Sequence, residues 1–248
     1  MHEENIIIKS NLLSQFPGIT HGISTKSGGF DKPPFFNNLS YVVGDDKNNV
    51  KSNREKFFGS LNIDMNNLAI PKQIHSSNIR IINESGSYPE TDALITNSKN
   101  IFLVISVADC YPVLIYDRKN QIVSAVHSGW RGTQKRILTH AIKKMYDDFK
   151  SVPADLFVFI GPGISNEYFE VGEEVASQFD DKYCEGRNGK YFINLRANII
   201  DQLDNMQIPA NNIDIHPMCT YKEKDYLHSY RRDKDKSGRM FAVIGISS

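Results

Sequence analysis

The sequence has few cysteines, no net charge and no long apolar run, and each shortage excludes a class of protein. Three cysteines in 248 residues, Cys110, Cys184 and Cys219, are too few for a disulfide framework. Their odd number is typical of a reducing compartment, where a thiolate is free for a metal or for catalysis. Because 29 basic side chains cancel 29 acidic ones, the chain lacks the global field that binds nucleic acid or anionic membranes. Zero net charge still allows a local pocket that binds anions.

The rest of the composition is that of an ordinary globular protein. The chain is 40% hydrophobic, and its longest apolar run, 101–108, is too short to cross a bilayer. The first residues are acidic where a signal peptide is basic, and no apolar segment follows them. We therefore expect a soluble cytoplasmic protein, folded as one domain over residues 1–248, with no nucleic-acid or membrane partner.

Hydrophobic patterns predict strands that follow one another as well as strands that alternate with helices. Continuous or alternating apolar runs predict strands at 79–82, 101–108, 113–116, 122–126, 156–160, 213–215 and 241–246. Helical patterns are found at 50–61, 134–149, 172–179 and 194–206. Pro112 is expected to block a ladder bond just before the strand 113–116, and Asn194 is a plausible N-cap for the last helix. This succession favours an α+β fold with a mixed sheet over a doubly wound parallel sheet.

Two reactive side chains stand at the ends of neighbouring predicted strands. Cys110 follows the strand 101–108, and His127 ends the strand 122–126. If 113–116 and 122–126 form a hairpin, both side chains lie at the same edge of the sheet. His75 supplies a second imidazole, and two imidazoles with a thiolate are a natural ligand set for zinc. The spacing permits this triad without requiring it, because a single cysteine or histidine is more often a packing residue.

The residues around these positions closely resemble the multicopper polyphenol oxidase, or laccase-domain, family. The most specific elements are Ala-Asp-Cys at 108–110 before Pro112, and His-Ser-Gly-Trp-Arg-Gly at 127–132. Further matches follow in order at 24–29, 38–39, 43–46, 72–75, 91–96, 161–164, 169–172, 229–233 and 237–240. The resemblance implies mixed β-sheets packed as a sandwich and flanked by helices, the cytotoxic-necrotizing-factor-like or laccase-domain fold.

Bacterial members of this family are regarded as purine nucleoside phosphorylases. The resemblance therefore implies phosphorolysis of adenosine, inosine, guanosine and S-methyl-5'-thioadenosine, with adenosine deamination as a further activity. Its partners would be purine nucleosides and phosphate, and we expect a monomer or a small homo-oligomer. The family's zinc ligands carry over onto His75, Cys110 and His127, with copper as the alternative metal.

Other residues of the matched motifs are candidates for catalysis and binding. Asp109 could orient a histidine or accept a proton, and Arg131 is the second catalytic candidate. Candidates for binding substrate or phosphate are Lys26, Asn38, Gln73, Arg231, Arg232 and Arg239. The family usually has arginine where this chain has Lys26, and lysine cannot clamp a phosphate with two nitrogens. Trp130 could stack on a base, although packing is the commoner role.

The histidine content argues against copper oxidase chemistry. A multicopper oxidase holds several coppers with many histidines, whereas this chain has seven and no His-x-His pair. Redox-inactive zinc suits a Cys-His-His site better. Two alternatives to the nucleoside phosphorylase stay open. One is a cysteine hydrolase with Cys110 as nucleophile and His127 as base, for example editing peptidoglycan precursors. The other is a non-catalytic metal-binding module.

Overall fold

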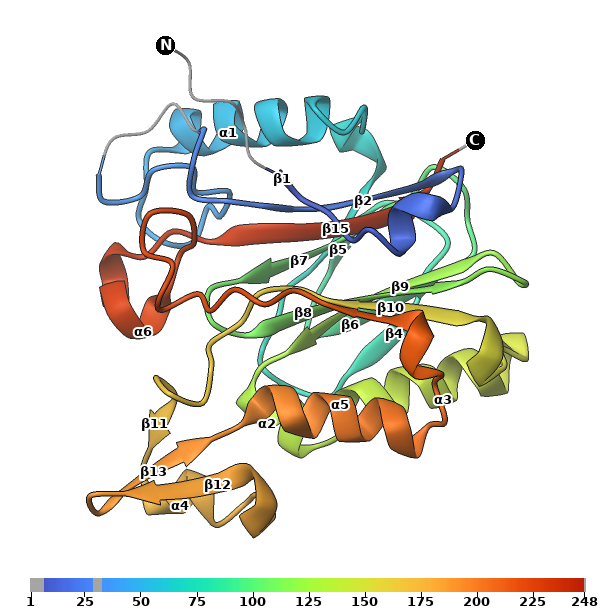
Figure 1. Cartoon of the computed structure of the whole chain (residues 1–248). Coiled ribbons are helices and arrows are strands. Elements are labelled where there is room, and N and C mark those ends of the chain that lie inside the picture. Colours follow the sequence, from blue (N-terminus) through green and yellow to red (C-terminus); the bar gives the residue numbers. More distant parts are fainter. Residues whose placement is uncertain (1–6, 29–32, 248) are drawn as a thin grey trace.

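The computed structural model describes residues 7–28 and 33–247, whose main elements are two six-stranded mixed sheets packed face to face (Figure 1). In order across the first sheet lie β1 (Ile7–Ile8), β2 (Ile19–Ser24), β15 (Met240–Ile246), β7 (Phe102–Val107), β3 (Leu68–Pro71) and β5 (Gly86–Tyr88). The second sheet contains β14 (Ile213–Ile215), β10 (Leu156–Ile160), β8 (Tyr111–Asp117), β9 (Ile122–Ser128), β6 (Ala93–Thr96) and β4 (Ile79–Ile81). The predicted α+β sandwich is thus confirmed.

Helices cover the outer faces of both sheets. In Figure 1, α1 (Lys47–Gly59) lies over the first sheet, and α3 (Ile137–Phe149) and α5 (Leu195–Asn205) lie under the second. Short helices are α2 (Trp130–Gln134), α4 (Glu173–Ala176) and α6 (Tyr230–Asp233). No helix in the described part of the chain has the length and apolarity needed to cross a membrane.

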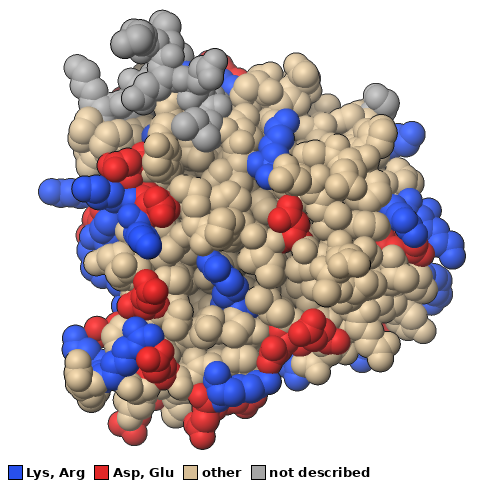
Figure 2. All heavy atoms as spheres, viewed as in Figure 1, with Lys and Arg blue, Asp and Glu red and all other residues tan. Residues whose placement is uncertain are grey.

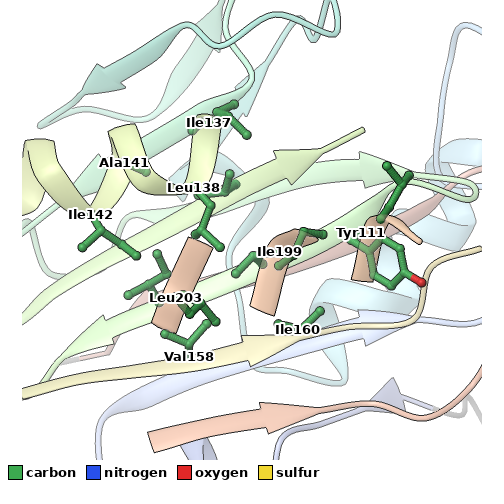
Figure 3. Close-up of a cluster of buried hydrophobic side chains, with 14 of the residues drawn as sticks. Tyr111, Ile137, Leu138, Ala141, Ile142, Val158, Ile160, Ile199 and Leu203 are labelled. Atoms are coloured by element: carbon green, nitrogen blue, oxygen red, sulfur yellow. The ribbon is translucent and has the colours of Figure 1, made fainter. Parts of the chain in front are cut away.

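The central strands are buried on both faces, which explains their uninterrupted apolar runs. In β7, Leu103 and Ile105 face the core between the sheets, whereas Phe102 and Val104 pack toward α1. In β8 and β10, alternate residues likewise face the other sheet or the helices α3 and α5. Figure 3 shows this helix side, where Ile137, Leu138, Ala141 and Ile142 of α3 and Ile199 and Leu203 of α5 meet Val158 and Ile160 of β10. Each such large side chain stabilises the fold by about 1.5–3 kcal/mol through burial.

Three expectations about element boundaries were wrong. The helix predicted over 134–149 begins only at Ile137, because Arg136 takes a left-handed φ of 58°, and the loop predicted before it contains the short helix α2. The helix predicted over 172–179 is reduced to the single turn of α4. Pro112 lies inside β8, where its carbonyl accepts a hydrogen bond from Gly161. Its ring nitrogen faces the same neighbour, just past the last β8–β10 pair of Val113 with Ile160, and it has no N–H to give the reciprocal ladder bond.

A small third sheet was not predicted. It consists of β11 (Glu170–Val171), β13 (Lys190–Ile193) and β12 (Cys184–Arg187), and it projects from the main body at the lower left of Figure 1. Its hairpin turns at Asn188 and Gly189, which have φ angles of 50° and 73°. Asn-Gly is a strong signal for such a turn. Figure 2 shows charges of both signs gathered over this sheet, with no broad area of one sign on the face shown.

Candidate metal centre

The β8–β9 hairpin brings Cys110 and His127 to one edge of the second sheet. Pro112 pairs with His127 in the antiparallel ladder, so Cys110, just before β8, lies beside it, and the predicted hairpin is confirmed. His75 joins them from the segment after β3. The ligand atoms of His75, Cys110 and His127 all lie within 4.8 Å of one another. The two imidazole rings are 4.9 Å apart between centroids.

The donors and the space between them fit a metal ion. Two imidazole nitrogens and a thiolate form an open three-ligand set, which leaves a coordination position for substrate. A Cβ atom at Gly129 would lie 2.9 Å from Cys110 Sγ and 3.0 Å from His75 Nδ1. Glycine at this position therefore keeps the space beside the ligand atoms free. The geometry supports metal binding, and three soft or borderline donors suit zinc or copper.

The buried carboxylate of Asp92 organises two of the three donors, although it was not among the predicted site residues. Its Oδ1 lies 2.9 Å from Nδ1 of His127, which leaves Nε2 of that ring for a metal. The same carboxylate accepts hydrogen bonds from the backbone N–H of His75 at 3.0 Å and of Ser76 at 2.8 Å. Asp92 falls within a matched motif, but its role depends on contacts that spacing does not reveal.

Two residues of the site have left-handed backbone conformations. His75 has a φ of 58° and Asp109 a φ of 89°, each of which costs a non-glycine residue about 1–3 kcal/mol. The hydrogen bonds to Asp92 hold the His75 segment in place. Asp109 is held by its own carboxylate, which accepts from Thr220 Oγ1 at 2.7 Å and from the Arg231 N–H at 2.6 Å. The carboxylate that orients a histidine is thus that of Asp92, and Asp109 instead anchors two loops.

The charges of the triad depend on one another. Burial raises the pKa of the Cys110 thiol, but His127 and His75 lower it by more, so the pKa lies below its ordinary value. Burial lowers the pKa of His127, whereas the charges and hydrogen bonds of Cys110 and Asp92 raise it above its ordinary value. Burial also opposes ionisation of Asp92, but hydrogen bonds from His127 and Ser76 lower its pKa to about 2. Cys110 is therefore held close to the thiolate form that binds metals.

The triad opens into a cavity of about 1410 Å³. Pockets for one small ligand have volumes of about 300–1,000 Å³, so this cavity has room for two reactants. Its walls carry six cationic side chains against three acidic ones: Arg54, Lys72, Arg131, Arg231, Lys234 and Arg239 against Asp109, Glu170 and Glu174. The zero net charge of the chain therefore conceals a local excess of positive charge at the site.

Five of the predicted catalytic and binding residues line this cavity: Gln73, Asp109, Arg131, Arg231 and Arg239. The amide of Gln73 donates to the carbonyl of Ser106 at 2.9 Å and accepts from its N–H at 2.7 Å, so it ties the His75 segment to β7. Arg131 is exposed and lies 4.4 Å from the centroid of Trp130. The Trp130 ring is half-buried, packs against the helix-side core and also lines the cavity.

The structure does not bring Lys26, Asn38 and Arg232 to the cavity. Lys26 lies in a separate hollow, where its Nζ donates to the carbonyl of Lys224. Asn38 is fully buried, and its side chain bonds the backbone of Ser40 and Arg239 and the carboxylate of Asp45.

The Arg232 guanidinium is occupied in the same way. It donates to the carbonyls of Thr220, Tyr221 and Leu227 and pairs with the carboxylate of Asp233. These three side chains therefore organise the loops behind the site, and nothing in their positions brings them to a ligand in the cavity.

Comparisons with known proteins show which family and which structures the chain is similar to. The family described as multi-copper polyphenol oxidoreductase laccase matches residues 20–247. A purine nucleoside phosphorylase of Bacteroides thetaiotaomicron is 33% identical over 94% of each chain. The purine nucleoside phosphorylase YlmD of Bacillus subtilis is 29% identical over 91% of this chain and 87% of its own. Among solved structures, YlmD of Geobacillus stearothermophilus has a TM-score of 0.90 at 26% identity, covering 98% of this chain and 100% of that one. YfiH of Bacillus licheniformis has a TM-score of 0.88 at 30% identity, covering 92% and 93%.

Proposed function

The chain belongs to the multi-copper polyphenol oxidoreductase laccase family, and from this premise we propose that it is a zinc-dependent purine nucleoside phosphorylase. Relatives named purine nucleoside phosphorylase support a nucleoside-processing enzyme. The observation that carries the proposal is that a His-Cys-His triad opens into a large cavity with an excess of cationic side chains. Such a site suits an anionic phosphate and an uncharged nucleoside held side by side.

In the proposed reaction, a phosphate oxygen attacks C1' of the ribose while the bond from C1' to the purine nitrogen breaks. The bonding electrons leave with the purine, which takes up a proton, and the products are free base and ribose 1-phosphate. Zinc held by His75, Cys110 and His127 would supply a Lewis acid that orients and polarises an oxygen of the reactants.

The chain's own residues position the reactants. The guanidinium groups of Arg131, Arg231 and Arg239 line the cavity and would attract and neutralise phosphate. Arg231 and Arg239 are partly buried, and the charge of Arg239 interacts with those of Asp109 and Cys110, which places it near the metal ligands. Trp130 offers half-exposed aromatic surface at the cavity wall, against which a purine could pack.

Copper oxidase chemistry fits the site less well than zinc-dependent phosphorolysis. Within the described residues, His75, Cys110 and His127 form the one group of close histidine, cysteine and acidic ligand atoms. His21 and His228 are buried in the core, and His140 is exposed on α3. A multicopper centre requires several more histidines near the triad. We therefore propose zinc as the resident metal, with copper as a competing ion.

We propose adenosine, inosine, guanosine and S-methyl-5'-thioadenosine as substrates. Adenosine deamination is a second proposed reaction at the same centre, in which water replaces the C6 amino group and ammonia leaves. We further propose that residues 1–248 act as one domain, as a monomer or a small homo-oligomer, in the cytoplasm. The three unpaired cysteines are in keeping with a reducing compartment.

A cysteine hydrolase is the second candidate, and one observation favours it. Cys110, His127 and Asp92 are linked in the order of a nucleophile, a base and an orienting carboxylate. The thiol pKa is already lowered by the two histidines without any metal. Activity that persists in metal-free protein would favour this candidate over the zinc enzyme.

Product analysis tests the proposed reaction. Purified protein is incubated with inosine or adenosine, with and without phosphate, and the products are separated by chromatography. We expect free base and ribose 1-phosphate, and only when phosphate is present. Free ribose would instead indicate hydrolysis, and inosine formed from adenosine would indicate deamination. If no nucleoside is turned over, the proposed function is wrong.

A further inference from the structure

Two arginines from opposite ends of the chain are fixed to one short segment at the cavity wall. The carbonyl of Leu39 accepts a hydrogen bond from Nε of Arg54, on α1, at 2.7 Å. The N–H of the same Leu39 donates to the carbonyl of Arg239, just before β15, at 3.1 Å. Asn38 adds a bond from the Arg239 N–H to its Oδ1 at 2.9 Å. Asn38 and Leu39 thus hold the Arg54 guanidinium and the Arg239 backbone on the same short segment.

Aromatic rings fix the direction of the Arg54 guanidinium. Its central carbon lies 4.2 Å from the ring centroid of Tyr41 and 4.9 Å from that of Phe241. Because successive side chains of an extended segment alternate, Arg239 and Phe241 project to the same face. The side chains of Arg54, Arg239, Tyr41 and Phe241 all line the cavity.

Neither guanidinium forms an ion pair with a carboxylate in the described part of the chain. Across residues 7–28 and 33–247, the ion pairs of arginine involve Arg118, Arg187 and Arg232, and none involves Arg54 or Arg239. Arg239 donates from Nη1 to the carbonyls of Ser237 and Gly238. Arg54 makes its described protein hydrogen bond through Nε alone, so its two terminal nitrogens are available to the cavity.

Burial makes this arrangement costly unless a ligand completes it. Both side chains are partly buried, and burial lowers the pKa of the Arg54 and Arg239 guanidinium groups. A partly desolvated cation that no carboxylate contacts loses solvation free energy, and a bound anion offsets that loss. The planar fork of a guanidinium matches phosphate oxygens, and two forks suit a dianion better than a single carboxylate.

We infer that Arg54 and Arg239 form a binding site for a phosphoryl group on the cavity wall that leads to the metal ligands. The ring of Phe241, over which the Arg54 guanidinium lies, belongs to β15, where Phe241 pairs with Ser106 of the neighbouring β7. Ser106 in turn holds Gln73, two residues before His75. The site is therefore continuous with the candidate metal centre. The phosphoryl group is either inorganic phosphate, which rests on the proposed phosphorolysis, or the 5'-phosphate of a bound nucleotide.

Calorimetric titration of zinc-loaded protein tests the site independently of turnover. Inorganic phosphate, adenosine and adenosine 5'-monophosphate are titrated into the wild type, Arg54→Met and Arg239→Met. Methionine keeps an unbranched apolar stem between the rings and removes the charge. The wild type should bind phosphate or the monophosphate saturably, and each variant should weaken that binding by about 10- to 100-fold. Arg118→Met is the matched control, since Arg118 also lies over a ring, that of Phe157, but pairs with Asp155 outside the cavity.

The two ligands distinguish the sources of the phosphoryl group. If the site binds the cosubstrate, the variants should bind inorganic phosphate more weakly than the wild type and bind adenosine with unchanged affinity. If it binds a nucleotide, the variants abolish the preference for the monophosphate over adenosine. Either pattern supports the site, and the first also agrees with phosphorolysis. A protein that releases no base but shows either pattern would refute the proposed function and keep the phosphoryl site.

Two results would overturn the inference. One is a wild type that binds neither inorganic phosphate nor the monophosphate, and the other is an Arg54→Met variant with unchanged affinity for both. Thermal unfolding without ligand checks that each variant folds. If Arg54→Met does not fold, Arg54→Lys replaces it. Lysine keeps the charge but loses the fork, so we expect a smaller loss of affinity, and unchanged affinity would again refute the site.

Discussion

Asp92 connects two of the three proposed metal ligands through one carboxylate. It fixes the ring of His127 through Nδ1, and it holds the strained backbone of His75 through N–H groups. A single buried side chain thus controls both the direction of one ligand and the position of another. Metal ligands commonly depend on such an outer carboxylate for their orientation.

Replacing Asp92 by asparagine should weaken zinc binding by about 10- to 100-fold. The amide keeps one oxygen acceptor, but its NH₂ group would face N–H donors that bond the second carboxylate oxygen in the wild type. At least one of these hydrogen bonds is therefore lost. Zinc affinity is measured by competition with a chromophoric chelator. Asp117→Asn is the control, because Asp117 is equally buried and accepts from Lys119 and Asn120 in the β8–β9 turn, away from the triad. Equal affinities of wild type and Asp92→Asn would contradict the role given to Asp92.

Gly129→Ala should also reduce zinc binding, for a steric reason. The new Cβ would meet Cys110 Sγ at 2.9 Å, closer than real Cβ atoms come, and His75 Nδ1 at a tight 3.0 Å, so a ligand must move. We expect at least a tenfold loss of affinity, the equivalent of about 1.4 kcal/mol. Gly59→Ala at the end of α1 is the control, since nothing lies within 4 Å of its Cβ position. Zinc bound as tightly by Gly129→Ala as by the wild type would show that the triad is not the metal site.

At the scale of elements, the hairpin and the main strands were predictable because they are local. Strands buried on both faces give continuous apolar runs, and the β8–β9 turn follows directly from them. The break between α2 and α3 was not predictable, since Arg136 is an ordinary helix residue and no glycine or asparagine marks its positive φ. The Asn188-Gly189 turn carried a clear hairpin signal that the prediction overlooked.

The proposed site was predictable in its ligands and less so in its surroundings. Motif resemblance identified His75, Cys110 and His127, which the structure brings together. The contacts of Asp92 and Arg54 are with segments distant in the sequence, so no local sequence pattern predicts them. Arg232 is the opposite case, a residue that a matched motif predicted at the site and that lies outside the cavity. Its guanidinium donates to loop carbonyls, and a charge pattern cannot show such contacts.

The contact between the N-terminal segment and β2 should depend on pH. His21 Nε2 accepts a hydrogen bond from the Ser10 N–H, so its ring must be neutral at that nitrogen. Burial, with a smaller effect of Lys9, lowers the pKa of His21 from 6.5 to about 4. Between these values the unfolded chain binds a proton that the folded protein excludes. The free energy of unfolding should therefore fall on acidification by up to about 1.4 kcal/mol per pH unit.

Urea unfolding of wild type and His21→Gln between pH 7 and 4 measures this effect. Glutamine offers Ser10 an acceptor that does not titrate, so the variant should lose less stability on acidification. His140→Gln, which changes an exposed residue of α3, serves as the control. Parallel pH profiles for wild type and His21→Gln would show that His21 is not the titrating group.

At the scale of the whole molecule, neutral total charge and a cationic cavity coexist. Acidic side chains are dispersed over the surface and the small sheet, whereas six cationic residues line a cavity with three acidic ones. The cavity walls come from α1, β7 and the start of β15 in the sandwich and from β11 and α4 beside it. The fold therefore provides a fixed place for an anion beside a metal without giving the protein a general affinity for polyanions.

The most direct test of zinc-dependent phosphorolysis combines metal content with product formation. Wild-type protein is stripped of metal with a chelator, reloaded with zinc or copper, and assayed with inosine at several phosphate concentrations. We predict about one zinc per chain, as a three-ligand site requires, and hypoxanthine release that needs both zinc and phosphate and yields equimolar ribose 1-phosphate. Undiminished hypoxanthine release from metal-free protein, or release that is independent of phosphate, would contradict the account.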